Sequence, residues 1–211
     1  QKQFSDWAYF RFEIDQTMLA QALELFHAKN FLGLNLTVPH KVIALDTVKE
    51  ITQVAQSMGA VNTLKWTHSG YQGLNTDGYG LQMGIQEGLG QELEGNDIAI
   101  SGAGGAARAA IVQCLNQGCL SVSIFNRSKE RLDRMVSDLE GVGGHEKIKK
   151  LSSSAELSEL SAKGIYINAT SLGLKSGDGL PIDLHQLPNQ WALYDMVYNP
   201  LKTKLVATGL A

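Results

Sequence analysis

The chain of 211 residues is 44% hydrophobic and 18% charged, and its formal net charge is −3. This apolar content is sufficient for a packed core and excludes a disordered protein, while the near-neutral charge gives no indication of nucleic acid or an anionic membrane surface as a partner. No apolar run reaches the length of a membrane-spanning helix and no signal peptide is visible, so we expect a cytoplasmic protein.

The first predicted elements are a strand and an amphipathic helix. Apolar and charged residues alternate over residues 10–14, which is the period of a strand. Asp15 is expected to cap the following helix, and Asn30 to end it. The apolar face of this helix recurs at helical spacing and comprises Leu19, Ala22, Leu23 and Phe26.

A second strand is predicted over residues 33–38 and carries polar side chains on one face. Asn35 and Thr37 lie two residues apart and therefore point the same way. Pro39 ends the strand and suits the first turn of a helix. Lys41 then lies just past the end of the strand, where ligands of open α/β sheets bind.

A hairpin and a connecting helix follow. A helix is predicted over residues 48–58 and ends at Gly59. Residues 60–66 pair with residues 71–76 across a four-residue turn. A helix that starts after Asp77 and runs to about Leu89 leads into a glycine-rich stretch, so we expect it to connect two domains.

The stretch from Ile98 to Arg108 predicts a dinucleotide-binding loop. A short apolar strand leads into Gly102, Gly104 and Ala107, which have the G-x-G-x-x-G/A spacing. The first glycine permits the tight turn, the second lets a pyrophosphate approach the backbone, and the alanine lets the helix pack closely. Since this helix ends at Gly118 and a second strand over residues 121–125 follows at once, the unit is a β-α-β unit of the expected length.

The residues after the second strand indicate which dinucleotide binds. An NAD site usually has Asp or Glu there, whereas this chain has Asn126-Arg127-Ser128. A guanidinium can pair with the 2′-phosphate of NADP, so we favour NADP over NAD. The alternative is a solvated Arg127 beside Ser128, which would serve only as a helix N-cap.

The remaining elements complete an open parallel sheet. A helix begins at Ser128 and ends at the glycines over residues 141–144, and further strands are predicted over residues 147–151, 165–170 and 191–197, with a short helix capped by the serines at 152–154. We therefore expect an α/β fold with an N-terminal α/β substrate domain over residues 1–80. Residues 81–211 form a C-terminal doubly wound Rossmann domain, with the connector helix at its start.

Cysteine and histidine usage indicates neither a redox pair nor a metal site. Cys114 and Cys119 lack the C-x-x-C spacing, and the five histidines are scattered. We expect two reduced thiols and no metal.

Lys41, Asp77 and His40 are the candidate groups for proton transfer in the first domain. A Lys–Asp pair beside a nucleotide site can hold a hydroxyl group and transfer its proton during hydride transfer. Spacing alone favours Asp77 as a helix cap and Lys41 as a surface lysine over this catalytic role, and His40 is interpreted as a packing or surface residue.

Seven motifs, in order, resemble those of the shikimate dehydrogenases and span residues 33–203. They are Asn35–Lys41 (N-x-T-x-P-x-K), Gly59–Thr63 (G-A-x-N-T), Asn75–Gly78 (N-T-D-G), Gly102–Ala107, Asn126–Ser128, Asn168–Gly173 and Asp195–Tyr198. The resemblance implies an NADP-dependent oxidoreductase that interconverts 3-dehydroshikimate and shikimate by hydride transfer. It would bind small molecules only and be a monomer or a homodimer.

The resemblance also implies roles for individual residues. Lys41 and Asp77 match the catalytic pair of the family. Positions that match substrate contacts are Asn35, Thr37, Lys41, Asn62, Asp77 and Tyr198. Positions that match cofactor contacts are Gly102, Ala103, Gly104, Gly105 and Ala106 at the pyrophosphate, Asn126, Arg127 and Ser128 at the 2′-phosphate, and Thr170 and Met196, of which Met196 lines the nicotinamide pocket.

Two features of the family are not in this chain. The S-x-S segment that grips the substrate carboxylate normally precedes the region where the chain begins, and a closing helix with a glutamine on the substrate would follow Ala211. Because the chain starts with Gln1 rather than Met, we expect it to be a piece of something longer. Two alternatives stay open: a quinate/shikimate dehydrogenase that uses NAD or NADP, and a non-catalytic NADP-binding module.

Overall fold

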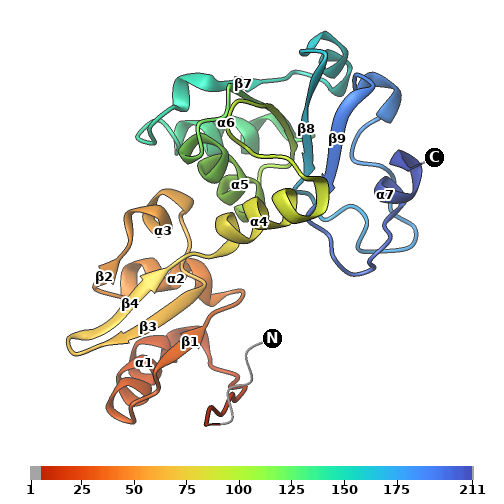
Figure 1. The fold of residues 1–211 in the computed structure, drawn as a ribbon. Coiled ribbons are helices and arrows are strands. Elements are labelled where there is room, and N and C mark those ends of the chain that lie inside the picture. Colours follow the sequence, from red (N-terminus) through yellow and green to blue (C-terminus); the bar gives the residue numbers. More distant parts are fainter. Residues whose placement is uncertain (1–5, 211) are drawn as a thin grey trace.

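The computed structural model describes residues 6–210 and contains two β-sheets joined by helix α4 (Asp77–Leu89) (Figure 1). Our predicted domain limits include residues 1–5 and 211, which lie outside the described residues. Asp77 begins α4 as predicted, and Gly90 ends it in a left-handed conformation with φ +63°. The boundary that we propose at residue 80 therefore falls inside this connecting helix.

The first sheet has the strand order β1-β3-β4-β2 and is mixed. Its strands are β1 (Gly33–Asn35), β2 (Glu50–Ile51), β3 (Thr63–Thr67) and β4 (Gly70–Leu74). Strands β3 and β4 form the predicted antiparallel hairpin, whereas β2 pairs in parallel with β4. The accompanying helices are η1 (Gln16–Met18), α1 (Leu19–Ala28), α2 (His40–Thr47) and α3 (Gln53–Met58).

Helix α1 is built as its sequence pattern predicts. The Asp15 carboxylate accepts a hydrogen bond from the amide of Thr17, so the predicted cap precedes a 3-10 turn and then the helix. Leu19 and Leu23 on the predicted apolar face are buried in the core of the first sheet. Asn30 follows the helix with φ +59°, a conformation that asparagine tolerates better than most residues.

Two predictions in the first third are wrong. The described residues 10–14 form no strand, because alternation provides the period but no neighbouring strand supplies hydrogen bonds. Instead, the Phe12 ring packs against Phe26 and Phe31. The predicted helix over residues 48–58 starts only at Gln53, because Thr52 is its N-cap and the preceding residues form β2.

The predicted strand over residues 33–38 is also shorter than expected. Strand β1 ends at Asn35, although the amide of Leu36 still bonds to the carbonyl of Asn62 at 2.8 Å. Val38 is 81% exposed and does not share the buried face of Leu34 and Leu36. Pro39 is the N-cap of α2 rather than its first residue.

The second sheet is parallel throughout and has the order β7-β6-β5-β8-β9. Its strands are β5 (Asp97–Ser101), β6 (Ser121–Phe125), β7 (Ile148–Lys150), β8 (Lys163–Asn168) and β9 (Gln190–Asp195). The helices are α5 (Gly105–Asn116), α6 (Lys129–Ser137), α7 (Lys204–Gly209) and the 3-10 turns η2 (His145–Lys147), η3 (Ser154–Glu159) and η4 (Leu184–Gln186). This order, which reverses direction between β5 and β8, confirms the predicted doubly wound fold.

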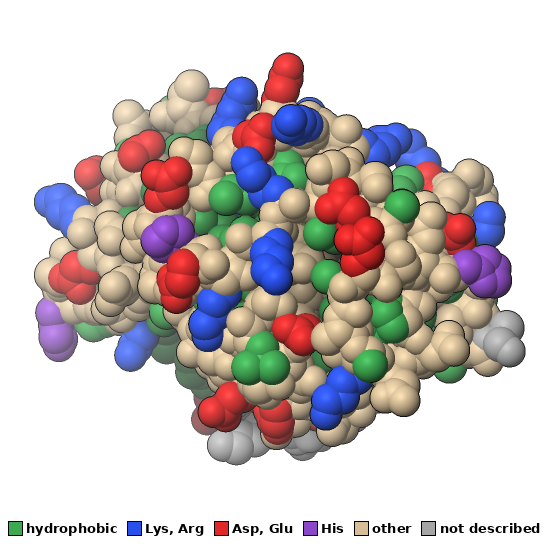
Figure 2. All heavy atoms as spheres, turned by 90° about the horizontal axis from the view of Figure 1, so that it is seen from above, with side chains coloured by type: hydrophobic (Ala, Val, Ile, Leu, Met, Phe, Trp, Pro, Cys, Tyr) green, Lys and Arg blue, Asp and Glu red, His purple; other side chains and the backbone are tan. Residues whose placement is uncertain are grey.

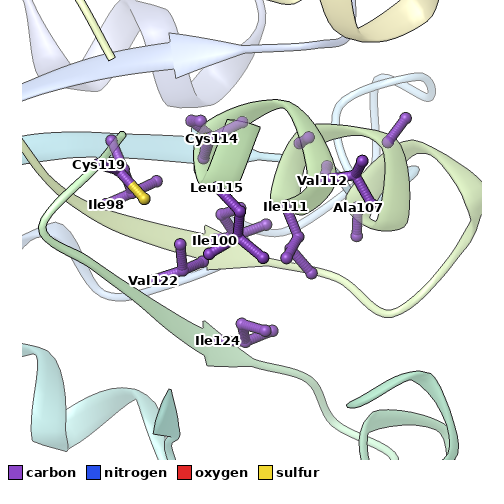
Figure 3. Close-up of a cluster of buried hydrophobic side chains, with 14 of the residues drawn as sticks. Ile98, Ile100, Ala107, Ile111, Val112, Cys114, Leu115, Cys119, Val122 and Ile124 are labelled. Carbon is purple, nitrogen blue, oxygen red and sulfur yellow. The ribbon is translucent and has the colours of Figure 1, made fainter. Parts of the chain in front are cut away.

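Helix α5 packs on strands β5 and β6 through a continuous apolar cluster (Figure 3). The fully buried members include Ile98, Ile100, Ala107, Ile111, Val122 and Ile124. Neighbouring residues of these strands are buried on both faces, as is usual in a parallel sheet covered by helices. Burying each large aliphatic side chain contributes about 1.5–3 kcal/mol relative to leaving it exposed, so this cluster fixes the start of α5 against the end of β5.

The surface carries both signs of charge. Figure 2 shows Lys and Arg side chains interspersed with Asp and Glu over the face seen from above. No helix among residues 6–210 is long and apolar enough to cross a membrane. Within the same described residues, no group of three or more histidine, cysteine or acidic side chains could hold a metal ion.

The two cysteines are buried free thiols, which generates a prediction about their reactivity. Burial raises the pKa of Cys119 to about 11 and that of Cys114 well above its usual value. Because the thiolate is the reactive form, a thiol reagent at about pH 8 should react with neither cysteine in the folded protein. Both thiols should react once urea unfolds the chain, as a colorimetric thiol titration measures. Rapid reaction of either thiol without unfolding would contradict the burial.

Candidate active site

The Asp77 carboxylate lies at the centre of the polar cluster in the first half of the chain. One of its oxygens, Oδ2, accepts a hydrogen bond from Lys41 Nζ at 2.9 Å, and the other, Oδ1, accepts one from Asn62 Nδ2 at 2.8 Å. The backbone amide of Asp77 donates to the side chain of Asn75, whose own amide group donates to the carbonyl of Ala60. Asp77 at the start of α4 is thus held through hydrogen bonds to its carboxylate and through one from its own backbone amide.

Asn62 is buried, and its side-chain amide is fully used. Its oxygen accepts hydrogen bonds from the Thr76 amide at 3.0 Å and from the Thr63 hydroxyl at 2.9 Å. Its nitrogen donates to Asp77 and, at 3.1 Å, to the Thr76 hydroxyl. A buried amide with all partners present is rigid, so Asn62 orients the carboxylate of Asp77.

Asn35 joins the same network through a threonine that our sequence reasoning did not single out. Asn35 Nδ2 donates to the Thr63 hydroxyl at 3.4 Å, and Thr63 in turn bonds to Asn62. The Asn35 oxygen accepts a hydrogen bond from the hydroxyl of Tyr9 at 3.2 Å. Thr63 directly follows Asn62 in the G-A-x-N-T motif. The motif therefore contained a signal that Thr63 belongs to this hydrogen-bond network.

The Lys41–Asp77 pair is open to solvent on one side. The side chain of Lys41 is 29% exposed and that of Asp77 is 37% exposed. A backbone hydrogen bond outside the sheet holds Lys41 of α2 near the hairpin, because the carbonyl of Lys41 accepts from the amide of Val61, two residues before β3, at 2.7 Å. Both charged groups are therefore partly accessible from solvent.

Two of the predicted substrate residues lie apart from this network. Thr37 is exposed, and its hydroxyl has no hydrogen-bond partner among residues 6–210. Tyr198 follows β9 in the second unit and is 84% exposed. The structure thus connects Asn35, Lys41, Asn62 and Asp77 to one another, and it leaves Thr37 and Tyr198 outside the hydrogen-bonded group.

The glycine loop between β5 and α5 has the local geometry that the sequence predicts. Gly102 has φ +126°, and a Cβ there would lie 2.8 Å from the carbonyl oxygen of Ala169, so only glycine fits. The positions where Gly104 and Gly105 would carry a Cβ are open, with no heavy atom within 4 Å. No side chain caps the start of α5, so its first N–H groups and the positive end of its dipole are available to a phosphate group.

The residues after β6 combine a helix cap with a free cation. The Ser128 hydroxyl accepts a hydrogen bond from the amide of Arg131 at 3.3 Å, which is the N-cap bond of α6. Asn126 Nδ2 donates to the carbonyl of Ser128 at 2.8 Å and so closes this turn. Arg127 is exposed and makes no ion pair within the described part of the chain. Its guanidinium is therefore free to bind an external anion.

A second buried network orders the loops after β8 and β9. Asn168 is fully buried; its oxygen accepts bonds from the amide and hydroxyl of Thr170, and its nitrogen donates to Asp195 at 2.9 Å. The Asp195 carboxylate also accepts bonds from the amide of Val197 and, at 2.6 Å, from the hydroxyl of Thr203. Sequence reasoning identified the motifs that contain Asn168 and Asp195 but gave neither residue a role.

This second network holds two predicted cofactor residues in place. Thr170 bonds to Asn168 directly, and the amide of Met196 donates to the carbonyl of Asn168 at 3.1 Å. Met196 also packs against the apolar cluster beneath α5, as does Ala103 of the glycine loop. The carboxyl ends of β5, β8 and β9 thus share one rigid edge, the edge at which open α/β sheets bind ligands.

A dinucleotide loop at the carboxyl edge of a parallel sheet, with a Lys–Asp pair in a second α/β unit, defines a dinucleotide-dependent oxidoreductase. The family model of the shikimate dehydrogenase substrate binding domain matches residues 1–64. A shikimate dehydrogenase (NADP(+)) from Geobacter metallireducens is 34% identical over 204 residues, which are 96% of this chain and 71% of that relative. The chain belongs to the shikimate dehydrogenase family.

Solved structures agree with this assignment. Shikimate 5-dehydrogenase from Listeria monocytogenes, solved in complex with shikimate and NAD, has a TM-score of 0.83 and 29% identity, and the match covers 93% of this chain and 70% of that one. Quinate dehydrogenase from Corynebacterium glutamicum, solved in complex with NAD, has a TM-score of 0.79 and 26% identity, with 91% and 68% covered.

Replacement of Asn168 by alanine tests the second network. Asn168→Ala removes the buried bonds to Thr170, Leu172 and Asp195 and leaves their groups without these partners. We expect a loss of about 2–4 kcal/mol in the free energy of unfolding, measured by urea denaturation. The matched control is Asn96→Ala, which removes one exposed bond to the carbonyl of Glu92 and should cost less than about 1 kcal/mol. Equal losses in the two variants would contradict a special role of the network.

Proposed function

We propose that this chain catalyses the interconversion of 3-dehydroshikimate and shikimate with NADP. The observation that carries the proposal is the Asp77 carboxylate, held by Lys41 and Asn62 and still open to solvent. Membership of the shikimate dehydrogenase family supports the same reaction. The test is the appearance of NADPH absorbance when the full-length gene product is mixed with shikimate and NADP; absence of turnover would refute the proposal.

The polar cluster of the first unit is the proposed substrate site. Asn35 and Asn62 are linked through Thr63, so a small ring bound at Asn35 would lie close to Asn62, whose amide holds Asp77 in place. Thr37 and Tyr198 have exposed hydroxyls, which a bound substrate would supply with partners. A site that hydrogen-bonds hydroxyl groups discriminates strongly against analogues that lack them, because its own polar groups would then stay unpaired.

The proposed mechanism assigns the proton to the Lys41–Asp77 pair. When the substrate hydroxyl is oxidised, its oxygen loses a proton as the hydride leaves the carbon. Lys41 accepts that proton in its neutral form, or stabilises the developing negative charge as an ammonium group. Asp77 fixes the lysine and accepts a hydrogen bond from the substrate. Asn62 holds the carboxylate in the orientation that serves both tasks.

The second unit is the proposed NADP site, and its residues fit that cofactor. The open backbone at Gly104 and Gly105 and the uncapped start of α5 suit a pyrophosphate, with Ala103 and Ala106 beside them. Asn126, Arg127 and Ser128 form a turn with one free cation for the 2′-phosphate, while Thr170 and Met196 lie at the neighbouring strand ends. When bound, NADP supplies the hydride acceptor in one direction and the hydride donor in the other.

Two alternatives remain as competing proposals. A quinate/shikimate dehydrogenase with NAD or NADP is favoured by the likeness to quinate dehydrogenase, which was solved with NAD. Turnover of quinate with NAD at a rate similar to that of shikimate with NADP would favour it. A non-catalytic NADP-binding module is opposed by the intact Lys41–Asp77 bond, since a module without a reaction has no need of the pair.

The remaining proposals concern partners and location. We propose a monomer or homodimer that binds small molecules and no nucleic acid, and that works in the cytoplasm. The interspersed charges of Figure 2 and the two free buried thiols support this view. Gel filtration of the full-length gene product would show the oligomeric state.

Replacement of Lys41 tests the mechanism. Lys41→Ala removes the group that handles the proton, so kcat should fall by about 10²–10⁴. The Kd for NADP should stay nearly unchanged, because the proposed cofactor contacts lie in the second unit. The control is Lys49→Ala, an exposed lysine just after α2, which should keep the original kcat. Near-full turnover of the Lys41→Ala enzyme would reduce Lys41 to a surface charge.

Replacement of Arg127 tests the choice of cofactor. Arg127→Ala removes a free guanidinium whose charge-assisted bonds to a phosphate contribute about 1.5–3 kcal/mol each, so NADP binding should weaken about 10- to 100-fold. Binding of NAD, which has no 2′-phosphate, should change little. Fluorescence titration with both cofactors measures the effect, and Arg134→Ala, an exposed arginine further along α6, is the control. Equal losses for NADP and NAD would refute the assignment.

A further inference from the structure

The side chain of Arg108 connects the second unit to the first. Arg108 lies in the first turn of α5, where its amide donates to the carbonyl of Gly104 in the glycine loop at 2.9 Å. Its side-chain Nε donates to the carbonyl of Ser57, in the last turn of α3, at 3.0 Å. One residue thus bonds to the proposed phosphate loop through its backbone and to the first unit through its side chain.

The guanidinium of Arg108 also reaches the end of α6. It forms an ion pair with the Asp138 carboxylate at 3.4 Å, and the Arg108 side chain is only 22% exposed. Its position at the ends of α3 and α6 is favourable, because the carboxyl end of a helix carries partial negative charge. The contact is therefore a three-way junction between α3, α5 and α6.

The junction leads directly to the Lys41–Asp77 pair. Gly59 ends α3 with φ +67°, and a Cβ there would lie 3.0 Å from Arg108 Nε. Two residues later, the amide of Val61 bonds to the carbonyl of Lys41, and Asn62 follows. A shift of the chain at Gly59 would therefore be passed to both groups that hold the Asp77 carboxylate.

We propose that Arg108 is a positioning residue, which sets the distance between the Lys41–Asp77 pair and the cofactor loop by fixing the end of α3 against the start of α5. The proposal rests on the reaction proposed above. Hydride transfer is sensitive to misplacement of the reacting groups by about 1 Å, whereas binding of each ligand to its own unit is not. Loss of Arg108 should therefore lower kcat more than it weakens binding.

The first experiment separates kcat from binding in three variants. Arg108→Ala should lower kcat about 10-fold and change the Kd for NADP and the KM for shikimate less than about 3-fold. Arg108→Lys should keep most of the turnover, since an ammonium group can still donate to the Ser57 carbonyl. Asp138→Asn removes the ion pair but not the Ser57 bond, so it should resemble the original enzyme. Unchanged kcat in Arg108→Ala, or a loss of NADP affinity as large as the loss of kcat, would overturn the proposal.

The second experiment requires no turnover and so distinguishes failure of this proposal from failure of the proposed function. Spin labels at Glu24→Cys on α1 and Lys163→Cys on β8 report the distance between the two units, and the native cysteines are buried and should stay unlabelled. Pulsed electron resonance should give a broader distance distribution in Arg108→Ala than in the original chain or in Asp138→Asn. The same width in all three chains would overturn the proposal even if the enzyme were active.

Discussion

The arrangement of the first unit depends on the carboxylate of Asp77. A partly buried carboxylate is stable only with donors on its oxygens, and here the donors come from Lys41 in α2 and from Asn62 ahead of β3. The carboxylate therefore joins three segments that are far apart in the sequence. Because Asn62 has no unused hydrogen-bonding capacity, none of these segments can shift without leaving a buried polar group unpaired.

Gly78, the residue after Asp77, lies where α4 packs against both units. A Cβ on Gly78 would meet the ends of the Met58 and Gln113 side chains, so both would have to move for any other residue, whereas glycine lets α4 lie this close to α3 and α5 without such a shift. Gln113 then donates to Gln82 of α4 at 2.7 Å, and α5 begins at the glycine loop. The aspartate at the start of α4 thus provides the charge, and the glycine beside it provides the close packing of the two units. Both are parts of one four-residue motif.

The sequence predicted those parts of the fold where a local pattern has one physical solution. The strand over residues 121–125 and the end of α3 at Gly59 are where the pattern placed them, because apolar runs between turns and left-handed glycines have few alternatives. The strand predicted over residues 10–14 is absent, because alternation of apolar and charged residues does not show whether a partner strand is present. The helix predicted from residue 48 begins only after Thr52. Threonine is a residue type that caps helices, and the prediction did not use this signal. The hydrogen bonds of Thr76 in the first network and of Asn168 in the second join segments that are distant in the sequence, so no local pattern contains them.

The motif residues divide into two groups by whether the chain itself supplies their partners. Asn62, Asn168 and Asp195 make their side-chain hydrogen bonds within the protein. Arg127, Thr37 and Tyr198 are exposed and have no such partners among residues 6–210. Because the described chain supplies no partner for these side chains, we propose that a ligand does so. In this proposal the exposed positions determine which ligand binds, and the buried positions hold those side chains in place.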